Sequence, residues 1–108
     1  IALDEKMTQS KHGDGFTPIG PWIETELDPG AVPMEVRVNG EIVGAADTSQ
    51  LAWNITEQLV YLTRYLTLGP GDIVLTGAPG TFAPVKPGDL GSITLGGIGT
   101  LSNPVRSR

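Results

Sequence analysis

The stretch from Lys11 to Trp22 combines residue types and spacing that suit a ligand site. It contains the chain's one histidine, His12, beside a lysine, and glycines at 13, 15 and 20 allow close approach of a ligand or positive φ. Prolines at 18 and 21 fix φ and remove backbone donors, so we expect an irregular loop. A ligand-binding loop and a plain solvated connector are both compatible with these residues.

A second candidate is Thr76-Gly77, which follows the short apolar run of residues 73–75. A hydroxyl and backbone amides exposed where a strand ends in a glycine turn can bind an anionic oxygen. A plain turn is the alternative interpretation.

Three acidic residues, Glu24, Glu26 and Asp28, alternate along a possible strand. Carboxylates on one strand face could bind a divalent ion, but we favour a solvated face and leave them out of the site. One histidine and no cysteines exclude multi-histidine and thiolate metal sites, and disulfides. The sequence shows neither a Ser-His-Asp arrangement nor a phosphate-binding P-loop.

Composition predicts one globular domain, with 108 residues of which 39% are hydrophobic and 18% charged. The net charge is −5, and the seven basic residues are scattered, which argues against nucleic acid or an anionic membrane as partner. No apolar run reaches membrane-spanning length and no signal peptide is visible, so we expect a cytoplasmic protein. Because the chain begins with Ile1, we expect it to be a piece of a longer protein.

The expected elements begin with a short helical turn at residues 3–9 and a short strand at 22–25. Residues 34–38 alternate apolar and polar side chains, the pattern of a half-buried strand. Asn39-Gly40 predicts a tight hairpin with a returning strand at 41–45, because both residues tolerate positive φ.

One main helix is predicted after Asn54, which forms a capping box with Glu57. An apolar stripe at helical spacing is expected to pack in the core; it consists of Ile55, Leu59, Leu62 and Leu66. The Gly69-Pro70-Gly71 sequence should end this helix.

The C-terminal part predicts strands at 73–75, 92–95 and 99–101, the last two joined at Gly96-Gly97. Pro-Gly-Asp occurs at 70–72 and again at 87–89, which we interpret as shared turn chemistry rather than an internal repeat. Short strands, one helix and Gly/Pro turns predict an α+β, strand-dominated domain.

Four segments together resemble the fumarylacetoacetate hydrolase family, in its order and at its spacing. They are Lys11 with Phe16-Thr-Pro-Ile-Gly-Pro-Trp22, Val38-Asn-Gly-Glu41, Leu68-Gly-Pro-Gly-Asp-Ile-Val-Leu-Thr-Gly-Ala-Pro-Gly80, and Pro87-Gly-Asp with Gly97-Ile-Gly-Thr-Leu-Ser-Asn-Pro-Val105. The resemblance covers nearly the whole chain and implies that residues 1–108 are the C-terminal part of one catalytic domain. It also implies a mixed β-sheet folded into a roll or barrel.

The resemblance implies a metal-dependent hydrolase, isomerase or decarboxylase of enolisable oxo-acids. Such substrates are acylpyruvates, fumarylpyruvate or fumarylacetoacetate, oxaloacetate and 2-hydroxyhepta-2,4-diene-1,7-dioate, several of them intermediates of aromatic catabolism. Family members hold Mg²⁺, Mn²⁺ or Ca²⁺ on two glutamates and an aspartate that lie upstream of Ile1, so no metal ligand is expected in this chain and Asp4 is no replacement. A homodimer is also implied.

The resemblance carries roles over to a small set of residues. Lys11 matches the active-site lysine beside the metal and the substrate's carboxylate or enolate oxygen. Gly15 stands where the family often has threonine, so only a backbone role near the metal carries over. Thr76, with Gly77, matches the Thr-Gly-Thr-Pro turn that binds the substrate's carboxylate, while Ala78 replaces its second threonine.

Two further expectations complete this interpretation. His12 occupies no family position and is expected to be solvated. The alternative function, from a different class, is a non-catalytic homologue used for binding or assembly, and the departures at Gly15 and Ala78 favour it. Loss of the upstream metal ligands would distinguish it from the enzyme.

Overall fold

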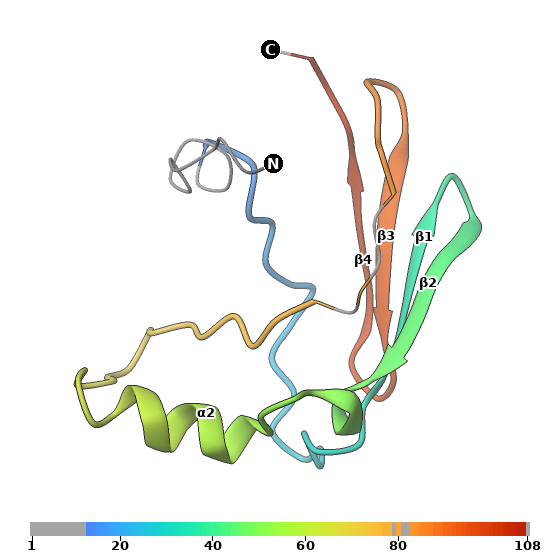
Figure 1. The fold of residues 1–108 in the computed structure, drawn as a ribbon. Coiled ribbons are helices and arrows are strands. Elements are labelled where there is room, and N and C mark those ends of the chain that lie inside the picture. Colours follow the sequence, from blue (N-terminus) through green and yellow to red (C-terminus); the bar gives the residue numbers. More distant parts are fainter. Residues whose placement is uncertain (1–12, 79, 81–82, 108) are drawn as a thin grey trace.

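The computed structural model describes residues 13–78, 80 and 83–107. In chain order its elements are β1 (Pro33–Val38), β2 (Glu41–Asp47), the 3₁₀ turn η1 (Thr48–Gln50), α2 (Ile55–Leu62), β3 (Leu90–Leu95) and β4 (Gly99–Pro104). The strands form one sheet in the order β2-β1-β3-β4, and α2 extends away from it (Figure 1). The α+β class with one main helix is confirmed.

All neighbouring strands of this sheet pair antiparallel, so the expected mixed sheet is wrong for the described strands. Both hairpins connect strands through short turns, and antiparallel pairing is what such connections allow. The described sheet is open, with β2 and β4 as its edges.

The β1–β2 hairpin is confirmed at the predicted turn. Asn39 has φ 51° and Gly40 has φ 87°, the positive values that a type I′ turn requires. Between Val36 and Arg37 the pairing shifts, so that Val36 faces Gly44 whereas Arg37 faces Ile42. This β-bulge in β2 increases the local twist of the sheet edge.

The two faces of the sheet differ in polarity, because side chains alternate along each strand. On one face, Glu35 and Arg37 form a 2.6 Å ion pair, and the hydroxyls of Ser92 and Ser102 lie 2.8 Å apart. The opposite face carries apolar side chains, here called the apolar face: Met34, Val36, Val38, Ile93, Leu95 and Leu101.

Very little of the described chain is buried. Val32, at 4% exposure, is the one buried hydrophobic residue among the described positions, and Asp89, at 7%, is the one buried charged residue. The Val32 backbone is clamped by Thr48, whose N–H donates to the Val32 carbonyl and whose Oγ1 accepts the Val32 N–H.

The capping box at the start of α2 is confirmed. The Glu57 N–H donates to Asn54 Oδ1 (2.9 Å) and the Asn54 N–H to Glu57 Oε2 (2.8 Å). The helix ends at Leu62, earlier than predicted, where the Thr63 hydroxyl donates to the Leu59 carbonyl and the chain continues as turns. A side chain that competes for helix carbonyls favours such an end.

The core-packing prediction for the helix stripe is wrong within the described residues. α2 has no buried residue, and Leu59 and Leu66 are exposed. Ile55 and Leu62 are half-buried, and Ile55 lines a hollow together with Val32 and Leu95, so the stripe is covered only in part.

Two predicted strands are also wrong. Residues 22–25 form no strand; nearby, the Glu24 carboxylate accepts the Glu26 N–H (2.8 Å), a local bond that competes with strand pairing. Residues 73–75 lack strand pairing, and Ile73 and Leu75 are exposed. The predicted helical turn at 3–9 lies outside the described residues. No helix among the described residues has the length and apolar character needed to cross a membrane.

The β3–β4 hairpin and the repeated turn chemistry are confirmed. β3 and β4 pair from Leu90–Pro104 to Leu95–Gly99 around Gly96-Gly97-Ile98, extending both predicted strands. In the two Pro-Gly-Asp turns the aspartate carboxylate accepts a backbone N–H three residues earlier: Asp72 from Gly69 (2.8 Å) and Asp89 from Lys86 (2.9 Å).

Candidate functional site

Thr76 and Gly77 lie in the extended segment that returns from α2 toward the sheet (Figure 1). Thr76 is half-buried, while Gly77 is exposed and has φ 124°. A side chain at Gly77 would be strained by that φ, although its Cβ would lie 3.9 Å from Leu51 Cδ2, an ordinary contact distance. The turn therefore packs beside the segment that follows η1.

Thr76 and Gly77 line a hollow of about 440 Å³, here called the Thr76 hollow. It is formed by the ends of β1, β2 and β3, by η1 and by the turn itself. Its lining residues are Met34, Ala45, Ala46, Asp47, Thr48, Gln50, Leu51, Thr76, Gly77, Ala78, Gly80 and Leu95. The described lining combines apolar side chains with a few hydroxyl, amide and backbone groups, as expected for a small-molecule site.

Asp47 is the charged residue among the described lining of this hollow. Hydrogen bonds from Ser49, whose backbone N–H donates to Asp47 Oδ1 at 2.8 Å, lower the pKa of the Asp47 carboxyl. Asp47 is therefore ionised at neutral pH. No lysine or arginine is among the described lining residues, so a bound anion would depend on neutral donors here.

The structure does not bring Gly15 into this hollow. Gly15, with φ 77°, lines a second hollow of about 520 Å³ over the apolar face, together with Phe16, Val36, Ile93 and other residues. Both hollows lie on the same side of the sheet, since Met34 lines one and Val36 and Val38 the other. Thr76 and Gly77 are together, whereas Gly15 is separate.

Several predicted positions cannot be placed in this geometry. Lys11, the predicted catalytic and substrate-binding residue, lies outside the described residues, as do His12 and Asp4.

Glu24, Glu26 and Asp28 are exposed, as a solvated role requires. The carboxylates of Glu24 and Asp28 accept nearby backbone N–H groups.

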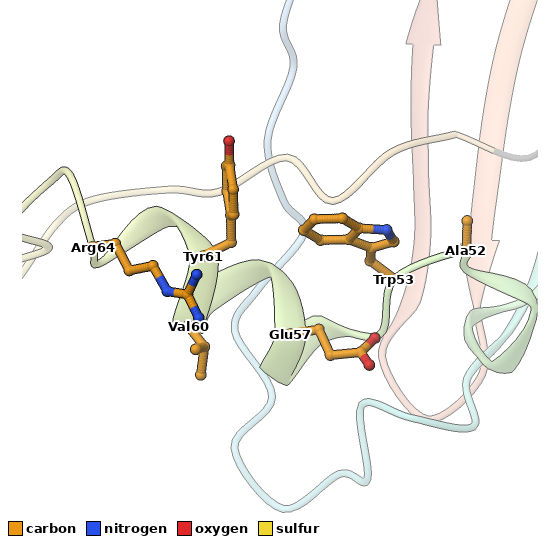
Figure 2. A pocket seen from close by; sticks show the side chains of 6 residues that line it. All are labelled: Ala52, Trp53, Glu57, Val60, Tyr61 and Arg64. Atoms are coloured by element: carbon orange, nitrogen blue, oxygen red, sulfur yellow. The ribbon is translucent and has the colours of Figure 1, made fainter.

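Sequence reasoning missed an aromatic group formed by Tyr61 of α2 and by Trp53 and Tyr65, which lie just before and just after the helix. The rings of Trp53 and Tyr61 meet edge to face at 5.4 Å, and Tyr61 meets Tyr65 at 5.5 Å. Figure 2 shows Trp53 and Tyr61 on the same side of the helix, beside a hollow of about 370 Å³ that Glu57 and Arg64 also line. The sequence spacing could have indicated this group, because Tyr61 follows Trp53 by eight residues and precedes Tyr65 by four, and such spacings place side chains on one side of a helix.

Comparison with known proteins establishes the family. The family model described as "Fumarylacetoacetate (FAA) hydrolase C-terminal" matches residues 2–106. The chain therefore belongs to the fumarylacetoacetate hydrolase family, which confirms the resemblance seen in its sequence. Its relatives include a maleylpyruvate hydrolase and a 4-hydroxyphenylacetate degradation bifunctional isomerase/decarboxylase.

Three similar proteins illustrate this relationship. Protein Rv2993c of Mycobacterium tuberculosis is 42% identical over 105 residues, which are 94% of this chain and 40% of that protein. The structure of 2-hydroxyhepta-2,4-diene-1,7-dioate isomerase from Mycobacterium marinum matches with a TM-score of 0.91 and 41% identity, over 95% of this chain and 41% of that one. Maleylpyruvate hydrolase from Sphingobium sp. SYK-6, in complex with manganese(II) ion and pyruvate, matches with a TM-score of 0.80 and 34% identity. This match covers 84% of this chain and 36% of that one. The chain thus spans about 40% of the length of the first of these relatives.

Proposed function

We propose that residues 1–108 are the C-terminal part of a single catalytic domain that acts on enolisable oxo-acids. Family membership supports this, as do an isomerase of a hydroxydienedioate and a maleylpyruvate hydrolase among the similar structures. Both substrate names describe a 2-oxo acid or its 2-hydroxy-2-ene form, a group that can exist as an enol or enolate. Carbon–carbon hydrolysis, isomerisation and decarboxylation all require that this charge be stabilised.

The Thr76 hollow is the observation that carries the proposal. Thr76 and Gly77 line a hollow sized for a small acid, and the sequence resemblance matches them to the family's carboxylate-binding turn. In the proposed site they bind the substrate's carboxylate. Lys11 places an ammonium beside the enolate oxygen, and Gly15 acts through its backbone.

The described residues contain no group of three or more histidine, cysteine, aspartate or glutamate side chains that could bind a metal ion. On the family resemblance, we propose that Mg²⁺, or Mn²⁺ or Ca²⁺, is held by residues upstream of this chain. The manganese(II) ion in the Sphingobium hydrolase supports a divalent ion. A homodimer and a cytoplasmic location belong to the same proposal, on the family resemblance.

The proposal is tested by a substrate panel on the complete domain, with and without Mg²⁺. Loss of enol absorbance is followed for acylpyruvates, oxaloacetate and a hydroxydienedioate. Metal-dependent turnover of one of them supports the proposal and identifies the reaction. Tight metal binding without turnover of any member contradicts the substrate class.

A non-catalytic homologue is the second candidate, and Ala78 favours it. Ala78 lines the Thr76 hollow where the family's turn has a second threonine, so one hydroxyl contact is missing. A complete domain that neither turns over any oxo-acid nor binds a divalent ion would establish this alternative.

Substitution of Thr76 by valine tests the carboxylate contact. Valine keeps the shape but removes the hydroxyl, so KM for the oxo-acid is expected to rise about tenfold with a smaller change in kcat. Thr76→Ser keeps the hydroxyl and is the matched control, expected to stay near the wild-type KM. Equal KM values for the valine and serine variants would exclude the hydroxyl contact.

Substitution of Ala78 by threonine tests the missing hydroxyl. Ala78 is exposed beside the hollow, so the larger side chain has room. A new hydrogen bond to the carboxylate is expected to lower KM about fivefold. Ala78→Val adds comparable volume without a hydroxyl and is expected to give no such gain; an equal gain in both variants would indicate packing instead.

A further inference from the structure

A capping box fixes the carboxamide of Gln50 at the edge of the Thr76 hollow. Gln50 Oε1 accepts the Asp47 N–H at 3.1 Å, while Asp47 Oδ1 accepts the Ser49 N–H at 2.8 Å. One acceptor position of the carboxamide oxygen is therefore occupied by the backbone. Gln50 Nε2 makes no hydrogen bond to a described residue, and because Gln50 is exposed its two N–H groups are open to solvent or to a ligand.

The capping box and the Thr76-Gly77 turn are neighbours. Leu51, which follows Gln50 directly, lies within ordinary contact distance of a Cβ built on Gly77, and Gln50 lines the same hollow as Thr76. Residues from two segments far apart in the sequence thus line one hollow. Those that carry donors include Thr76 with its hydroxyl, Gly77 with its backbone N–H and Gln50 with its carboxamide.

Because of the charges around this hollow, binding of an anion by its described residues depends on neutral hydrogen-bond donors. The ionised Asp47 carboxylate opposes an anion, and no described lining residue is basic. Asp47 is also the residue whose N–H holds Gln50 in place. A neutral amide offers N–H donors to an anion without adding negative charge, whereas a second carboxylate would increase the repulsion of that anion.

Given the proposed function, on which this inference rests, we infer that Gln50 is a specificity-determining residue that donates from Nε2 to the carboxylate of the oxo-acid. It acts together with Thr76. The side chain selects for an anionic end group because one acceptor position of its oxygen is already occupied.

Gln50→Glu in the complete domain tests the inference. Glutamate keeps an oxygen for the Asp47 N–H but replaces the donor by a negative charge, so the capping box is retained. KM for the oxo-acid is expected to rise about tenfold or more, with kcat within about twofold. Calorimetric binding of pyruvate, with Mn²⁺ present, is expected to weaken by a similar factor.

Thr56→Glu is the matched control, because it adds the same charge six residues along the chain, in the first turn of α2, and leaves the capping box intact. Thr56 is exposed and is not among the lining residues of the hollow. Pyruvate binding within about twofold of wild type is expected for this variant. Thermal unfolding of both variants checks that the fold is intact.

The outcomes separate the inference from the proposed function. Unchanged pyruvate binding in Gln50→Glu, or equal weakening in Thr56→Glu, overturns the role of Gln50 alone. A wild-type domain that neither binds pyruvate nor turns over any oxo-acid overturns the proposed function and this inference with it.

Discussion

Replacing Lys11 by alanine in the complete domain is expected to lower kcat for the oxo-acid by about 10²–10³-fold, the usual cost of removing one group that stabilises an oxyanion. The ammonium is proposed to stand beside the enolate oxygen, where negative charge develops as the bond breaks. Its removal should therefore affect the chemical step more than substrate binding. Initial rates from the loss of enol absorbance measure the effect.

Lys86→Ala is the control for the loss of a positive charge. Lys86 is exposed and lines neither the Thr76 hollow nor the hollow that contains Gly15. This variant is expected to keep near-wild-type kcat. If Lys11→Ala also retained wild-type kcat, Lys11 would have no catalytic role, and the resemblance at that position would concern structure alone.

Replacing Asn39 by aspartate is expected to destabilise the fold. The loss of stability relative to wild type should be larger at neutral pH than in acid. Asn39 Nδ2 donates to Asp89 Oδ1 (2.9 Å), and Asn39 Oδ1 accepts the Leu90 N–H (2.9 Å), so one side chain joins the β1–β2 turn to the start of β3. Aspartate keeps the acceptor and tolerates positive φ, but it turns a carboxylate toward the buried Asp89.

The pH dependence of this variant follows from Asp89. Hydrogen bonds from Asn39 and from the Lys86 backbone lower the pKa of the Asp89 carboxyl below its ordinary 3.8. In the wild type, Asp89 therefore contributes stability above its unfolded pKa and loses it as pH falls through the lower folded pKa. In Asn39→Asp, acid relieves the repulsion between the two carboxylates, so the stability difference from wild type should narrow as pH falls toward 4.

Urea unfolding of the complete domain at several pH values measures these differences. Asn39→Gly is the comparison: it fits the φ of 51° and removes both hydrogen bonds without adding charge, at an expected cost of about 1–2 kcal/mol. Asn39→Asp should be the less stable of the two at pH 7 and should improve relative to Asn39→Gly in acid. A pH-independent difference between them would exclude the Asp89 contact as its cause.

Local chemistry explains which parts of this fold could be predicted. Asn39-Gly40 predicted its hairpin because the φ values that the turn needs are accessible to few residues. Asn54 and Glu57 predicted the helix start because both hydrogen bonds of the box lie within one turn. Each feature depends on neighbours a few residues apart.

The failed predictions depend on partners that are distant in sequence. Residues 73–75 have the composition of a buried strand, but a strand needs a paired neighbour, and the described residues supply none. The α2 stripe has helical spacing, but the described residues cover it only in part and bury none of it. Gln50 was missed because Gln50 and Thr76 come to line the same hollow only through the path by which the chain returns to the sheet.

The pairing of β1 with β3 makes the segment between β2 and β3 a long excursion whose two ends are fixed by the sheet. That excursion contains η1, α2 and the Thr76 turn, while the four strands pair without using any of its residues. The Thr76 turn and Gln50, which are proposed to bind the substrate's carboxylate, are therefore encoded outside the four strands, although strand residues complete the wall of the hollow. If the proposed site is correct, a change such as alanine at position 78 would alter the binding of the acid without altering strand register, and one scaffold could then serve several reactions.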